Sequence, residues 1–300
     1  MTDVNGSRRN FLRTGAAAVG AVSVGLLSPT KQIQAAKFNN HHIKLSLAAY
    51  SFRNQFRNEN LTMEEFIDFC VDLGLDGTEL TSYFFESTDN SYLLSLRNKC
   101  FHLGIPISGT AIGNDFVTPK ESERRKQIGD VKGWIDRAVV LGAPSIRVFG
   151  GGPIPDGYSE ENVFDWVIPA MKECVEYAST KGIVLAIENH GGFPMTSTQV
   201  IRIVQEVDSP WFGVNLDTGN FLSDWYRQMA EVIPYTVVVQ FKVNLMNTVK
   251  GAPRIAADPE RIVRMLENEG YRRYLVLEYE EDNPYQEIPE WIEHLQKIVA

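Results

Sequence analysis

The chain has 300 residues, of which 44% are hydrophobic, and a formal net charge of −9. This length and apolar content suit one large core, and barrels of about 250 residues commonly form a single domain. The acidic balance argues against a nucleic-acid partner, because phosphate binding requires clustered Lys and Arg. The expected partner is therefore a small molecule, and a homo-oligomer remains open.

The N-terminal segment, residues 1–36, predicts a twin-arginine export signal. Arg8 and Arg9 precede an uncharged stretch of about 14 small and apolar residues, and Ala35 and Ala36 lie near the expected cleavage point. The stretch is shorter than the roughly 20 residues of a spanning helix. Such a signal is recognised by an export receptor and does not anchor the protein. The signals that it resembles direct the export of proteins that have already folded. We therefore expect a periplasmic or extracytoplasmic protein without a stable membrane span, with a retained anchor as the alternative.

The cysteines do not suggest a disulfide framework. Cys70, Cys100 and Cys174 are odd in number and widely spaced, and each lies in an apolar, helix-like segment. They are expected to be buried, unreactive thiols.

Residues 37–300 repeat one pattern from about residue 43 onward, in which a short apolar run is followed by an amphipathic stretch. The predicted strands are 44–50, 77–80, 105–110, 145–149, 184–188, 213–216, 237–241 and 274–278. The predicted helices are 63–73, 92–103, 121–141, 160–181, 198–206, 222–233, 259–269 and 286–299. Eight such units without a linker favour one closed (β/α)8 TIM barrel over an open sheet.

The ends of the predicted helices carry capping residues. Thr62, Ser159 and Asp258 precede helix starts. Glycines follow five helices, at Gly74, Gly104, Gly142, Gly182 and Gly270.

Acidic side chains end three of the predicted strands. Glu188 ends 184–188, Asp217 follows 213–216, and Glu278 ends 274–278. In a (β/α)8 barrel these positions converge at one mouth, where the acids would repel one another unless a positive charge lay between them. The pattern predicts a divalent metal ion held by these carboxylates, with structural ion pairing as the alternative.

The seventh predicted strand adds two polar side chains on one face. Gln240 and Lys242 are two residues apart, so both point to the same side. With Gln240 as the fourth ligand beside Glu188, Asp217 and Glu278, the site is all oxygen. Such a set favours Mn²⁺ or Mg²⁺, with Co²⁺ or Zn²⁺ possible.

The sequence resembles the xylose isomerase-like superfamily of sugar isomerases and epimerases from about residue 43 to 299. The matching runs are Ile-Glu-Asn-His at Glu188, Leu-Asp-Thr-Gly-Asn at Asp217 and Leu-Glu-Tyr at Glu278. The family usually has His where this chain has Gln240, and many members have His where it has Asn220. These departures leave the identity of the metal open.

The resemblance implies that Glu188 and Glu278 flank the substrate and move a proton next to a carbonyl group. The residues expected to bind substrate are His190, Lys242, Arg147, Asn220 and Glu280. For Lys242 and Arg147 the alternative is ion pairing with Glu280 or Glu79. Aromatic residues near the strand ends would form a sugar-stacking wall or pack as a lid; they are Phe52, Tyr83, Phe84, Phe149 and Trp225.

The predicted function is therefore a metal-dependent sugar isomerase or epimerase. The first alternative is a lyase or dehydratase that acts by β-elimination on a keto-sugar or a 3-keto-glycoside. The second is a non-catalytic sugar-binding barrel, suggested by Gln240. A nuclease of the same superfamily is disfavoured, because the sequence lacks the histidines of a multi-zinc site.

Overall fold

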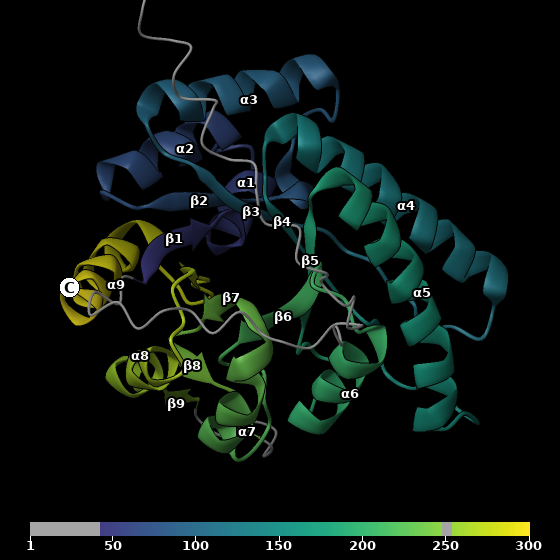
Figure 1. The fold of residues 1–300 in the computed structure, drawn as a ribbon. Helices are drawn as coiled ribbons and strands as arrows, with labels where there is room; N and C mark the ends of the chain where they lie inside the picture. Colours follow the sequence, from purple (N-terminus) through teal and green to yellow (C-terminus); the bar gives the residue numbers. More distant parts are fainter. Residues whose placement is uncertain (1–42, 248–253) are drawn as a thin grey trace, which may run out of the picture. The chain divides into compact units, whose positions relative to one another are not determined.

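The computed structural model describes residues 43–247 and 254–300. Eight parallel strands close into a barrel in the order β1-β10-β7-β6-β5-β4-β3-β2 (Figure 1). They are β1 (Lys44–Ala48), β2 (Gly77–Thr81), β3 (Ile107–Ala111), β4 (Ser145–Val148), β5 (Val184–Glu188), β6 (Phe212–Asp217), β7 (Thr236–Phe241) and β10 (Tyr274–Leu277). This closure confirms the predicted (β/α)8 TIM barrel.

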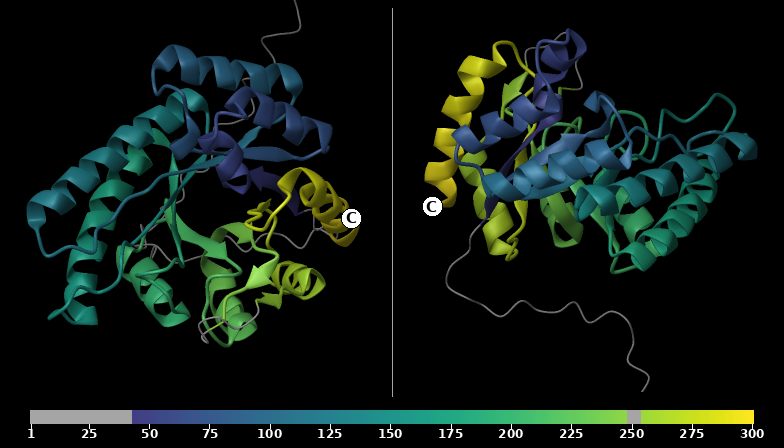
Figure 2. Two further views of the ribbon diagram at one scale, coloured as in Figure 1. Left: turned by 180° about the vertical axis from the view of Figure 1, so that it is seen from behind. Right: turned by 90° about the horizontal axis from the view of Figure 1, so that it is seen from above.

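Helices follow the strands and surround the barrel (Figure 2). The longer ones are α2 (Met63–Asp72), α3 (Asn90–Leu103), α4 (Glu121–Leu141), α5 (Glu160–Lys181), α6 (Ser197–Val207), α7 (Trp225–Val232), α8 (Pro259–Asn268) and α9 (Pro284–Val299). The predicted bounds of α4 and α5 coincide with the observed ones. The helix predicted to begin at residue 222 begins at Trp225, because Asp224 adopts a left-handed backbone with φ 48°.

Capping explains why so many helix ends were predictable. Thr62 and Ser159 each form a capping box with the residue three positions on, and the Asp258 side chain accepts a hydrogen bond from the backbone of α8. Gly104 and Gly142 end α3 and α4 in the left-handed conformation that glycine adopts without strain.

Several short elements of the described residues were not predicted. A 3-10 turn, η1 (Ala49–Phe52), and the short helix α1 (Arg53–Arg57) follow β1. A small hairpin, β8 (Asn244–Leu245) with β9 (Ile255–Ala256), follows β7. Segments this short lack the repeated apolar spacing from which an element is recognised.

The main core lies between the strands and the helices, where the Leu, Ile, Val and Phe side chains are buried. All three cysteines are buried and free, as predicted. Burial raises the pKa of Cys70 and Cys174 to about 12, so these thiols remain protonated near neutral pH.

Among the helices of residues 43–247 and 254–300, none is long and apolar enough to cross a membrane. The predicted export segment, residues 1–36, lies outside the described residues and stays a prediction.

Candidate active site at the mouth of the barrel

Three of the predicted site residues share one face of their strands. A separate cluster of small apolar side chains is formed by Ala48, Ala186, Val238 and Val276. Side chains alternate between the two sides of a strand. The residues two positions after Ala186, Val238 and Val276 therefore point to the same side as these three. Those residues are Glu188, Gln240 and Glu278, and all three are buried. The alternation of the strands therefore carries these polar groups to the end of the barrel.

Asp217 ends β6 and is fully buried. Its Oδ1 accepts hydrogen bonds from the backbone N–H groups of Gly219 at 2.8 Å and Asn220 at 3.0 Å. A Cβ on Gly219 would lie 2.7 Å from the Asn244 carbonyl oxygen, so this turn requires glycine. Oδ2 accepts no hydrogen bond from the described residues, and it forms an ion pair with Lys242 Nζ at 3.5 Å.

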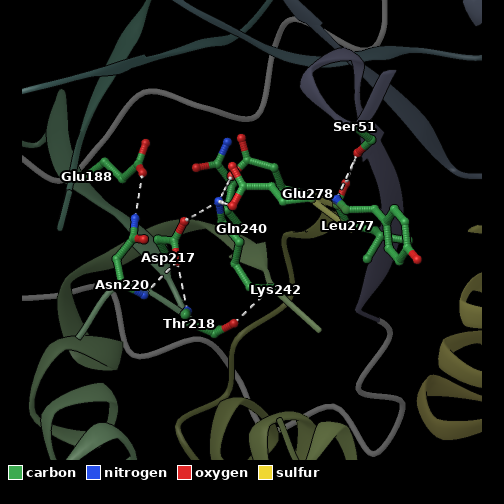
Figure 3. A network of polar contacts seen from close by, with 12 residues as sticks. Ser51, Glu188, Asp217, Thr218, Asn220, Gln240, Lys242, Leu277 and Glu278 are labelled. Atoms are coloured by element: carbon green, nitrogen blue, oxygen red, sulfur yellow. Dashed lines mark hydrogen bonds and ion pairs between the residues drawn. The ribbon is translucent and has the colours of Figure 1, made fainter. Parts of the chain in front are cut away.

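Lys242 lies among three carboxylates (Figure 3). Its Nζ is 2.8 Å from Glu280 Oε2, 3.0 Å from Glu278 Oε2 and 3.5 Å from Asp217 Oδ2. Burial acts to lower the pKa of Lys242, but these carboxylates raise it well above its usual value. Lys242 is therefore a charged ammonium group, and the expected pairing with Glu280 is present.

Arg147 is a buried residue of β4 and holds Glu188. Its Nε lies 3.0 Å from Glu188 Oε2, and its Nη1 donates to the Ile112 carbonyl at 2.7 Å. On the other side of Glu188, Asn220 Nδ2 donates to Oε1 at 3.2 Å. Arg147 thus forms its ion pair with Glu188, whereas the sequence suggested Glu79 as the partner.

Glu79 on β2 is a site residue that the sequence analysis considered only as an ion-pair partner. It is buried, and its Oε1 accepts a hydrogen bond from Gln240 Nε2 at 3.3 Å. Asn215 Nδ2 donates to Gln240 Oε1 at 2.5 Å, so the amide is held from both ends. The signal was present in the sequence, because Glu79 is a carboxylate within an apolar strand, as Glu188 is.

Burial sets the proton affinity of these acids. It raises the pKa of Glu79 and of Asp217 to about 7, and it raises that of Glu188 well above its usual value although Arg147 opposes the shift. Repulsion from Glu278 adds to the effect at all three positions. Acids with raised pKa values accept protons more readily, which suits a general base.

His190 lies at the rim, where its ring packs on Phe149 with centroids 4.3 Å apart. The Arg147 guanidinium covers the same Phe149 ring at 3.9 Å, so the three side chains form a stack. Other aromatic residues considered for a sugar wall pack elsewhere. Phe52 contacts Tyr285 at 4.9 Å, Phe84 stacks on Phe56 at 4.7 Å, and Trp225 Nε1 donates to the Met246 carbonyl at 2.8 Å. Lid packing therefore describes Phe52 and Phe84 better than sugar stacking.

The donor set of the mouth fits a hard metal cation. The acids there are Glu79, Glu188, Asp217, Glu278 and Glu280, and the cations paired with them are Arg147 and Lys242. The acids thus outnumber the cations, and Asp217 Oδ2 accepts no hydrogen bond from the described residues, although Lys242 Nζ lies 3.5 Å away. Within the described residues, no three His, Cys, Asp or Glu side chains are already gathered as a metal-binding group. The positive charge among these acids is that of Lys242 and Arg147.

Comparison with known protein families gives one match. The model of the xylose isomerase-like TIM barrel family matches residues 67–298. The chain belongs to this family. The family membership agrees with the resemblance seen at the strand ends, and a search of curated proteins finds no significant match.

Solved structures of the xylose isomerase-like fold superpose over most of the chain. D-psicose 3-epimerase from Clostridium cellulolyticum H10 has a TM-score of 0.71 at 14% identity, covering 86% of this chain and 100% of its own. The 3-keto-D-glucoside 4-epimerase of E. coli has a TM-score of 0.66 at 15% identity, covering 85% and 99%. The probable 3-DHS dehydratase of petrobactin synthesis from Bacillus anthracis has a TM-score of 0.66 at 15% identity, covering 86% and 98%. At these identities the likeness concerns the fold.

Proposed function

We propose that this chain is a metal-dependent sugar isomerase or epimerase that moves a proton on the carbon next to a carbonyl group. The observation that carries the proposal is the meeting of Glu188, Asp217, Gln240 and Glu278 at one end of the barrel, all buried. Membership of the xylose isomerase-like family supports it, and so does the likeness in fold to two epimerases.

The four side chains Glu188, Asp217, Gln240 and Glu278 would hold the metal. Carboxylate and amide oxygens favour Mn²⁺ or Mg²⁺, while Co²⁺ or Zn²⁺ is the less favoured choice. When bound there, such a dication would supply Lewis-acid chemistry, which makes the hydrogen next to a carbonyl group easier to remove. It would also balance the excess of acids over Arg147 and Lys242.

Glu188 and Glu278 are the proposed proton carriers. Burial raises the pKa of Glu188, which strengthens it as a base, while Arg147 at 3.0 Å and Asn220 at 3.2 Å fix its carboxylate in one orientation. Glu278 enters from another strand end, beside Lys242. One carboxylate takes the proton and the other returns it, so the carbon inverts or the carbonyl moves to its neighbour.

The polar groups around these acids are the proposed substrate contacts. Lys242 and Arg147 would stabilise negative charge on the substrate oxygen, and Asn220, Glu280 and His190 would bind hydroxyl groups at the rim. Asn220 and Arg147 contact Glu188, and Lys242 contacts Glu278. Glu280 pairs with Lys242, and His190 packs on Phe149.

The same site favours a second candidate, β-elimination. Lys242 Nζ is 3.0 Å from Glu278, and its positive charge would stabilise the negative charge that develops on a leaving oxygen. This candidate would be a lyase or dehydratase acting on a keto-sugar or 3-keto-glycoside.

Solvent deuterium distinguishes the candidates. The protein is incubated with Mn²⁺ and a panel of free ketoses, 3-keto-sugars and 3-keto-glycosides in D₂O, and the products are examined by NMR. An isomerase or epimerase exchanges the α-hydrogen and gives an isomer of equal mass. A lyase gives a new double bond or a released aglycone. Absence of both exchange and product across the panel would contradict proton transfer.

A further inference from the structure

We infer that the substrate is a glycoside whose second sugar residue binds in a separate cavity beside the mouth, an inference that rests on the proposed function. The cavity has a volume of about 310 Å³ and is lined by Ser51, Arg53, Asn54, Gln55, Glu281, Asp282, Asn283 and Pro284. Ligand pockets begin at about 300 Å³, so this volume suits one ring-sized group.

The position of the cavity joins it to the proposed active site. It lies between the segment after β1, residues 51–55, and the segment after β10, residues 281–284. A smaller cavity of about 60 Å³ is lined by Lys242, Glu278 and Glu280 among others, and Glu281 lines both cavities. The smaller cavity can hold only part of a sugar ring, so the reacting carbonyl end of a two-ring substrate would enter beside Lys242 and Glu278, while its second ring would lie in the larger cavity beside Gln55.

Hydrogen bonds hold one wall of the cavity, residues 51–55, against the chain around Glu278. Ser51 Oγ accepts a hydrogen bond from the Tyr279 backbone N–H at 2.9 Å and lies 3.4 Å from the Leu277 carbonyl (Figure 3). Arg53 Nη2 donates to the Glu280 carbonyl at 2.8 Å. These bonds tie the segment after β1 to the chain on both sides of Glu278, so a ligand in the cavity is positioned relative to that carboxylate.

The chemistry of the lining selects a neutral, hydroxyl-rich group. Asn54, Gln55 and Asn283 contribute amides that make no side-chain hydrogen bond with the described residues. Such amides offer both donors and acceptors, which a sugar ring can satisfy. The charged groups of the lining are Arg53, Glu281 and Asp282, and Glu281 is paired with Arg254, so the positive and negative charges roughly balance and an uncharged group is favoured.

Equilibrium binding to the full-length protein with Mn²⁺ tests the inference. The probes are glucose and 3-ketoglucose against trehalose, maltose, cellobiose and their 3-keto forms, because the linkage decides where the second ring falls. At least one disaccharide should bind about tenfold more tightly than its monosaccharide, the effect of two or three additional hydrogen bonds. In the double variant Asn54→Ala with Gln55→Ala this ratio should fall to about one.

Asn58→Ala is the matched control, since Asn58 is an exposed amide just beyond α1 and does not line the cavity; it should keep the ratio. Equal binding of monosaccharides and all disaccharides, or an unchanged ratio in the double variant, would overturn the inference and leave the proposed function standing. If no sugar bound at all, while circular dichroism showed a folded protein, the proposed function and this inference would both fail.

Discussion

At the scale of single residues, the two proposed proton carriers stand in different surroundings. Glu188 is clamped between Arg147 and Asn220, while Glu278 lies beside Lys242, which is shared with Asp217 and Glu280. A carboxylate held from both sides keeps one orientation, whereas one beside a shared ammonium group is stabilised by a positive charge that other acids also contact. The two acids are therefore not interchangeable.

Replacing either acid by its amide separates metal binding from proton transfer. In Glu188→Gln and Glu278→Gln an oxygen remains for the metal but the base is lost, so turnover should fall by about 10²–10⁴-fold while metal binding weakens modestly. Exchange of the substrate α-hydrogen in D₂O should disappear in one variant, which identifies the residue that removes the first proton. Parental exchange in both would move that role to His190 or Lys242.

Removal of the Asp217 carboxylate tests the metal directly. The parental protein should bind about one divalent ion per chain, and Asp217→Ala should abolish this, because the change removes both a charge and a ligand. Metal content after dialysis gives the measurement, and Asp224→Ala, which removes an acid at the start of α7, is the control. Stoichiometric metal in Asp217→Ala would exclude Asp217 from the site.

Gln240→His tests which atom of the seventh strand faces the metal. The imidazole replaces an amide oxygen with nitrogen, so activity should be retained with a preference shifted toward Co²⁺ or Zn²⁺. The ratio of activity with Zn²⁺ to that with Mn²⁺ is the readout. An unchanged ratio would place residue 240 outside the coordination shell.

At the scale of elements, the strands and long helices were predictable because local chemistry specifies them. Capping boxes fix the starts of α2 and α5, and glycine fixes the ends of α3 and α4. The positions of Glu188, Asp217 and Glu278 at strand ends predicted that they share the mouth, and the two-residue alternation added Gln240 and Lys242. The ion-pair partners could not be predicted from the sequence. Whether Arg147 contacts Glu79 or Glu188 depends on side chains from different strands, and no local sequence pattern encodes that choice.

The capping box of α5 gives a stability prediction at this scale. Ser159 Oγ accepts a hydrogen bond from the Asn162 backbone N–H at 3.3 Å. Ser159→Ala should lower the free energy of unfolding by about 0.5–2 kcal/mol without changing metal binding. Denaturant titration measures the loss, and Ser122→Ala, an exposed site within α4, should leave the free energy nearly unchanged. Equal effects of the two changes would argue against the cap.

At the scale of the whole molecule, the export prediction concerns residues 1–36. Arg8→Lys with Arg9→Lys should leave the protein in the cytoplasm, folded and able to bind metal, because the pair is an address and not part of the barrel. Cell fractionation and metal content of the retained protein provide the measurement. Normal export of the double variant would contradict the targeting prediction.

Closure of the barrel makes the first strand depend on the last. β1 pairs with β10, from Lys44 opposite Tyr274 to Leu47 opposite Leu277, so nearly the whole chain must leave the ribosome before the ring is complete. A nascent chain that stops before β10 exposes the edges of β1 and β7, which are templates for pairing with other chains. If the predicted export signal accepts only folded proteins, export must wait until β10 has been synthesised and the barrel has closed. The signal is synthesised first, but it can be used only after the last strand.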